Sequence, residues 1–104
     1  MSTPDSIDTL YQQAVDEMAK RALDYGKSEI FDLPDDDIFI IKIAGQEIKG
    51  WMRYIRLAGG LHHVIFSLTR KTLLVVYKLY LSGVKVGVDG SVSLLSEEEV
   101  AGYD

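Results

Sequence analysis

The chain contains no cysteine, and this absence excludes a disulfide framework, a zinc–thiolate site and catalysis by a cysteine nucleophile. Proline is scarce, since only Pro4 and Pro34 occur, and there is no low-complexity tract or internal repeat. The most apolar run, Leu73 to Tyr77, is far too short to cross a bilayer. Met1 to Asp5 lacks the basic and apolar regions of a signal peptide. We therefore expect a cytoplasmic protein that does not associate with membranes.

The composition is nevertheless that of a folded protein. The 104 residues are 47% hydrophobic and 10% aromatic, which is enough apolar material for an ordinary core. Disordered chains have lower hydrophobicity and higher net charge for their length. We expect residues 1–104 to form a single globular domain.

Charge is sorted along the chain. Residues 1–37 carry ten acidic and three basic side chains, whereas residues 38–85 carry eight bases and a single acid, Glu47. Residues 86–104 carry five acids and no base, so the three segments have formal charges of −7, +7 and −5. The basic centre indicates contact with something anionic. The net charge of −5 disfavours nonspecific binding to nucleic acid, because the molecule as a whole repels phosphate.

An amphipathic helix is predicted over residues 4–25. Pro4 suits the first helical position, and Asp5 and Asp8 favour the positive end of the helix dipole. Gly26 then serves as a C-terminal cap, and residues 27–37 connect the helix to the next element. Apolar residues recur at helical spacing throughout the segment: Ile7, Leu10, Tyr11, Ala14, Met18, Ala22 and Tyr25.

The period of the pattern then changes to that of an antiparallel meander. Strands are expected at residues 38–43, 47–57 and 61–68, with turns at 44–46 and 58–60. Gly50, inside the second of these strands, marks a bulge or a close approach to the backbone.

The C-terminal part predicts a hairpin with strands at residues 84–88 and 92–95 around a turn at Asp89–Gly90. Ser96 and Glu99 have the spacing of a capping box, which indicates a last short helical turn.

Residues 70–82 allow two interpretations. Their apolar residues fit one wide helical face, but their β-branched and aromatic content also fits a buried strand. We favour a helix at about 70–82, with the alternative that residues 72–81 form a further strand. The predicted fold class is therefore α+β, with the N-terminal helix packed on the meander, a second helix and the C-terminal hairpin.

Strand alternation divides the first predicted hairpin into two faces. The natural core face carries Phe39, Ile41, Ile43, Ile48, Met52 and Tyr54. The second face is mixed and carries Ile38, Ile40, Lys42, Glu47, Lys49, Trp51, Arg53, Ile55 and Leu57. A two-layer protein would have a more polar second face. We therefore expect the second helix, another copy of the protein or a partner to cover it.

The candidate binding residues are Lys49, Trp51 and Arg53, with Arg56 as a further base. Aromatic and basic side chains are enriched at protein–protein hot spots, and on a sheet they also stack bases and hold phosphates. The competing structural interpretation makes Trp51 a partly buried core residue and the bases a solvated rim.

The function that we favour is a small non-enzymatic interaction or regulatory protein that binds another protein or itself. In a homodimer, the basic centre of one copy would face an acidic end of the other. One alternative is a binder of single-stranded nucleic acid that uses the basic sheet face. Another is an acidic inhibitor or nucleic-acid mimic that uses Asp35, Asp36 and Asp37.

No catalytic residue, metal site or cofactor is expected. His62 and His63 point to opposite faces of a strand and cannot chelate one metal ion, so one is expected to pack and the other to be exposed. Asp35–Asp37 lacks the glycine and distal glutamate of an EF-hand loop and indicates a solvated turn. The glycines of residues 83–87 follow the predicted helix, whereas a dinucleotide-binding turn precedes one.

Overall fold

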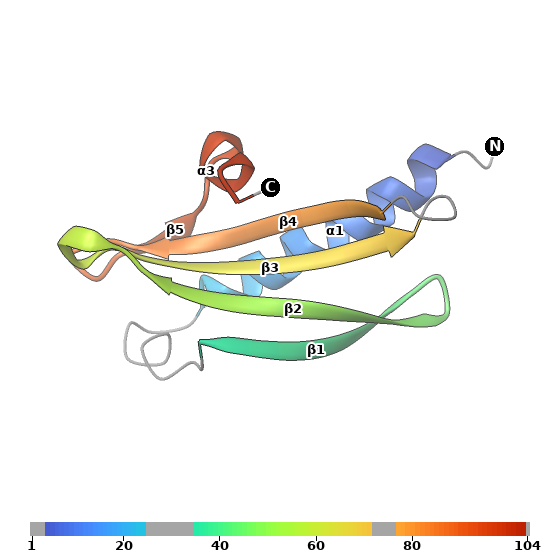
Figure 1. Ribbon diagram of the computed structural model, residues 1–104, viewed down its shortest axis with the longest axis horizontal. Helices are drawn as coiled ribbons and strands as arrows, with labels where there is room; N and C mark the ends of the chain where they lie inside the picture. Colours follow the sequence, from blue (N-terminus) through green and yellow to red (C-terminus); the bar gives the residue numbers. More distant parts are fainter. Residues whose placement is uncertain (1–3, 25–34, 72–76, 104) are drawn as a thin grey trace.

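The structure is a computed structural model that describes residues 4–24, 35–71 and 77–103. These residues form a long helix, a five-stranded antiparallel sheet and a short C-terminal helix, which confirms the predicted α+β class (Figure 1). The strands lie side by side in chain order as a meander. The elements are α1 (Pro4–Ala22), β1 (Asp36–Ile43), β2 (Gln46–Arg56), η1 (Ala58–Gly60), β3 (His62–Lys71), β4 (Tyr77–Val86), β5 (Val92–Leu94) and α3 (Glu97–Ala101).

Helix α1 confirms the helix predicted over residues 4–25, although it ends at Ala22. The proposed cap, Gly26, lies outside the described residues. From Tyr11 onward every third or fourth residue of α1 is buried, but this stripe matches the predicted one only in part. The buried positions are Tyr11, Val15, Ala19 and Ala22. Tyr11 and Ala22 are buried as expected, whereas Leu10 is 41% exposed.

The first two strands are joined by a tight turn in which Ala44 has φ 52° and Gly45 has φ 81°. Positive φ at both central residues is the geometry of a type I′ turn, whose twist matches that of the flanking strands. Gly50 pairs in regular register with Phe39 and with Leu68, so it does not mark a bulge. It marks the predicted close approach, because a Cβ at this position would collide with the Phe39 ring and the Leu68 side chain.

The helix favoured at residues 70–82 is wrong, because residues 77–86 form strand β4. Strand β4 pairs antiparallel with β3 from Tyr77 opposite Lys71 to Val86 opposite His62. Tyr80 points into the core while Leu79 and Leu81 point to the other face, so apolar residues on both faces imitate a wide helical stripe. The alternative of a further strand is correct over Tyr77–Leu81, and residues 72–76 lie outside the described residues.

The C-terminal part agrees with its prediction. Strand β5 pairs with the end of β4 as a hairpin, and α3 follows. The Ser96 hydroxyl accepts from the Glu99 backbone N–H at 3.2 Å, and the Glu99 carboxylate accepts from the Ser96 backbone N–H at 2.9 Å. The capping box read from the spacing is therefore present.

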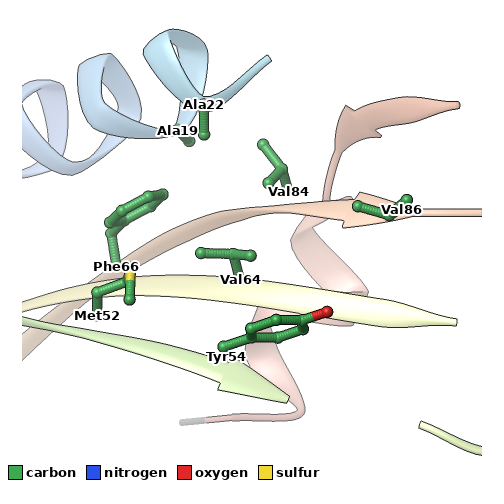
Figure 2. Close-up of a cluster of buried hydrophobic side chains, with 8 residues drawn as sticks. All are labelled: Ala19, Ala22, Met52, Tyr54, Val64, Phe66, Val84 and Val86. Carbon is green, nitrogen blue, oxygen red and sulfur yellow. The ribbon is translucent and has the colours of Figure 1, made fainter. Parts of the chain in front are cut away.

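The core lies between α1 and the face of the sheet predicted for it. Figure 2 shows Ala19 and Ala22 of α1 above the sheet side chains of one buried cluster. A second cluster continues along the helix around Val15 and Leu68, both fully buried. The sheet residues of the first cluster are Met52, Tyr54, Val64, Phe66, Val84 and Val86.

Helix α3 lies on the opposite face of the sheet from α1, and only at one end. Lys85 and His63 alternate with core residues along β4 and β3, so they point away from α1. The Lys85 ammonium donates to both carboxylate oxygens of Glu99 at 3.1 Å, and His63 Nδ1 lies 2.6 Å from the Tyr103 hydroxyl. The remainder of this second face has no described element over it (Figure 1).

Candidate functional site

The structure brings three of the four candidate binding residues together. Lys49, Trp51 and Arg53 alternate along β2 and share the second face of the sheet. Trp51 pairs directly with Ile38 of β1 and with Ser67 of β3. Lys49 pairs with Ile40, so two isoleucines of β1 complete the arrangement. We call Ile38, Ile40, Lys49, Trp51 and Arg53 the Trp51 patch.

Arg56 does not belong to this patch. Its parity in β2 is that of Tyr54, which is a core residue on the α1 side of the sheet. The Arg56 guanidinium lies 4.5 Å from the centre of the Tyr54 ring and forms an ion pair with Asp35. Strand alternation alone separates Arg56 from Trp51, so the sequence already contained the signal that excludes it.

The Trp51 patch is open to solvent. Ile38 is 51% exposed, Ile40 is 65% exposed and Trp51 is 40% exposed. Trp51 belongs to neither of the two buried clusters, and Arg53 beside it is largely exposed, as the competing structural interpretation also expects. Large apolar side chains gathered on one sheet face are characteristic of surfaces that contact another molecule.

The part of the second face that α3 and Tyr103 cover lies close to Trp51, as the cross-strand rows of residues show. In the row that contains Trp51 and Ser67, the β4 member is Leu81. In the next row, Ile65 is buried, and the row after that contains His63 and Lys85, which contact α3 and Tyr103. A hollow of about 180 Å³ lies at this boundary. Its lining comprises Arg53, Ile65, Ser67, Leu79, Leu81 and Tyr103.

The Trp51 patch is positively charged, and Asp36 offsets part of this charge. The Lys49 ammonium lies 5.7 Å from the centre of the Trp51 ring, within the range of a cation–π interaction. Arg53 Nε lies 3.8 Å from an Asp36 carboxylate oxygen, but both side chains are largely exposed, so this pair is weak. Among the described residues, no carboxylate forms an ion pair with Lys49.

The two histidines point to opposite faces, as alternation predicts. His63 is buried on the second face, and burial lowers the pKa of its imidazole below the ordinary 6.5. His62 lies on the core side, half-buried, with Nδ1 2.9 Å from the Tyr54 hydroxyl. His63 is therefore the packed histidine, whereas His62, the histidine expected to be exposed, is half-buried.

A cluster that the sequence reasoning missed joins α1 to the sheet at the other end of the molecule. The Asp8 carboxylate accepts from Lys78 at 2.6 Å, from Arg70 at 2.7 Å and from the Tyr80 hydroxyl. These donors, Lys78 first, hold the pKa of Asp8 well below its ordinary 3.8. Arg70 also lies 5.8 Å from the centre of the Tyr11 ring. These salt bridges and hydrogen bonds fix α1 on β3 and β4.

The acidic segment predicted as a turn begins β1. The Asp37 carboxylate accepts from the backbone N–H of Ile38 at 2.8 Å, while Asp35 and Asp36 pair with Arg56 and Arg53. Among residues 4–24, 35–71 and 77–103, no group of three or more histidine or acidic side chains is arranged to hold a metal ion. No helix in the same part of the chain has the length and apolar character needed to span a membrane.

Comparison of the chain with known proteins finds no matching family model, no matching curated protein and no matching solved structure. The surface itself therefore carries the functional argument.

Proposed function

We propose that this is a small non-enzymatic interaction protein that binds a partner protein through the Trp51 patch. The observation that carries the proposal is the solvent-exposed indole of Trp51, held on a rigid sheet between Lys49 and Arg53. Tryptophan and arginine are the side chains that most often dominate binding energy at interfaces. The sheet fixes the backbone that carries them, so no backbone segment has to be ordered on binding.

The side chains of the Trp51 patch favour a partner of a particular chemistry. Lys49 and Arg53 favour an acidic segment, and Trp51 with Ile38 and Ile40 favours apolar side chains on that segment. The adjacent hollow of about 180 Å³, between Arg53 and Tyr103, has room for one such side chain. The partner surface that fits is therefore an acidic segment with at least one large apolar residue.

Selection from a displayed random-peptide library tests this proposal. We expect enriched peptides to combine aspartate or glutamate with an apolar residue, and to bind less tightly as salt is raised. Trp51→Ala should weaken their binding by about 2 kcal/mol, or roughly thirtyfold in Kd. Leu10→Ala is the matched control, because Leu10 is 41% exposed on α1, away from the patch.

Two outcomes contradict the proposal. Peptides that bind Trp51→Ala as tightly as the unaltered protein would place the binding surface elsewhere. Quenching of Trp51 fluorescence by a single-stranded oligonucleotide, with an affinity that falls steeply with salt, would replace it with the nucleic-acid alternative. The placement of Arg56 on the other face leaves that alternative with fewer bases around Trp51.

The acidic-mimic alternative receives less support from the local charges. Asp35 is paired with Arg56 of the same chain, and Asp37 accepts from the Ile38 N–H, so both present less free negative charge to a basic groove.

A further inference from the structure

The second sheet edge, formed by the first half of β4, is unpaired over its described residues. Strand β5 pairs only with Val84, Lys85 and Val86, and the Leu95 N–H reaches one residue further to the Gly83 carbonyl at 3.0 Å. Peptide groups alternate in direction along an antiparallel strand. The outward-facing N–H and C=O groups before Gly83 are therefore those of Tyr77, Leu79 and Leu81.

Among the described residues, one side chain forms a hydrogen bond with these groups. The Gln12 amide of α1 donates to the Leu81 carbonyl at 3.1 Å, which confirms that this carbonyl faces away from β3. An exposed row of strand N–H and C=O groups is a template for pairing with another strand.

Among the described residues, no charged side chain of this edge projects past it. A lysine on an edge strand normally projects past it, but the Lys78 ammonium is drawn back onto α1 by Asp8 at 2.6 Å. The opposite edge, β1, differs: it carries Asp36, Asp37 and Lys42, and the Asp37 carboxylate occupies the Ile38 N–H. The edge of β1 therefore has charged side chains near both ends, whereas the one charged side chain of Tyr77–Ser82, Lys78, is held on α1.

The edge also has the shape of one half of a symmetric contact. An open groove of about 510 Å³ runs along it between α1 and α3. Leu81, Leu95 and Val100 give this groove an apolar wall. Tyr77, at the start of the same strand, is 64% exposed. In an antiparallel pairing with Leu79 opposite Leu79, Tyr77 of one copy lies opposite Leu81 of the other, which brings it to the mouth of that groove.

We propose that two copies of this chain associate through antiparallel pairing of their β4 edges, with Leu79 on the two-fold axis. The contact is isologous, as in most homodimers, because each copy supplies one Tyr77 and one groove. The two sheets become one, with both Trp51 patches on the same side of it. The free backbone edge carries this inference, so it stands independently of the function proposed for the Trp51 patch.

Sedimentation velocity over a wide micromolar range tests the association. We expect the unaltered protein to sediment as a dimer at the upper end of this range. Leu79→Lys places two like charges opposite each other at the axis and should raise the dimer Kd at least about tenfold. Thr69→Lys is the matched control, because Thr69 pairs directly with Leu79 on the same face but lies one strand inside the edge.

Cysteine crosslinking tests the location, since the chain has no cysteine of its own. With a short bis-maleimide, Leu79→Cys should give a covalent dimer, whereas Ile40→Cys, an exposed residue on the opposite edge, should remain uncrosslinked. A monomer at every concentration, or crosslinking at Ile40 in place of Leu79, would overturn the proposal. Trp51→Ala should leave the dimer intact, so failure here and failure of peptide binding are separate results.

Discussion

Gly50 lies beneath the ring of Phe39, its cross-strand partner, and a Cβ at this position would occupy the space of that ring. Gly50→Ala should therefore destabilise the protein by overpacking, by about 1–3 kcal/mol. Urea denaturation followed by circular dichroism measures the change. The cost of Gly50→Ala should shrink in a Phe39→Ala background, because the colliding ring is then absent. An equal cost in both backgrounds would assign the effect to the Leu68 side chain or to the backbone instead.

His63 gives the fold a dependence on pH near neutrality. Burial lowers its pKa below the value of about 6.5 expected in the unfolded chain. The unfolded state therefore binds the proton more readily. The resulting stability is fully present above pH 6.5 and is lost as the pH falls through the folded-state pKa.

His63→Gln tests this dependence. The unaltered protein should lose free energy of unfolding as the pH falls below about 6.5, and the variant should lack that slope. His62→Gln is the natural control, since its side chain lies on the opposite face of the same strand. Urea denaturation at a series of pH values measures the slope, and a slope that survives in His63→Gln contradicts the prediction.

At the scale of elements, α3 depends on its capping box and on Lys85. Ser96→Ala removes the side chain that accepts the Glu99 N–H and should cost α3 about 1 kcal/mol. Local opening then becomes about fivefold more frequent. Hydrogen exchange at the Val100 and Gly102 amides, which bond within α3, reports this opening. Ser93→Ala, on exposed β5, should leave their exchange unchanged.

Elements with local signals were predictable and β4 was not. The α1 periodicity and the Ser96–Glu99 spacing depend on neighbours within a few residues. Strand β4 has apolar residues on both faces because one face meets α1 and the other borders α3 and the Trp51 patch. Such a run has no period that separates strand from helix, and only its pairing with β3 decides.

The candidate site was predictable to the extent that it depends on alternation. Parity within β2 places Lys49, Trp51 and Arg53 together, and it also assigns Arg56 to the other face. The Asp8 cluster was beyond reach, because Arg70 and Lys78 are separated from Asp8 by 62 and 70 residues. Their proximity follows from the way α1 lies across β3 and β4, which no local pattern encodes.

At the scale of the whole molecule, two carboxylates make the free energy of unfolding depend on pH in the acidic range. The Ser96 backbone N–H and Lys85 lower the pKa of Glu99 from 4.5 to about 2, and Asp8 is lowered by Lys78, Tyr80 and Arg70. Depressed folded-state values mean that the stability they supply is present above the unfolded pKa values. It is lost as the pH falls through the folded ones.

Glu99→Gln separates the contribution of α3 to this acid sensitivity. The free energy of unfolding should fall less steeply between about pH 4.5 and about pH 2 in the variant than in the unaltered protein. Glu98→Gln, at the neighbouring exposed glutamate, should keep the original slope. Equal slopes in all three proteins would show that Glu99 titrates alike in the folded and unfolded states.

Because α3 rests on only one end of the sheet, the described residues form three layers there and two layers at the other end. At the two-layer end, near the Ala44–Gly45 turn, α1 is the only described element that shields the sheet backbone from water. The sheet amides at this end should therefore exchange with solvent faster than the amides that lie between the two helices. Where α3 also covers the sheet, the Lys85–Glu99 contact holds this second cover in place.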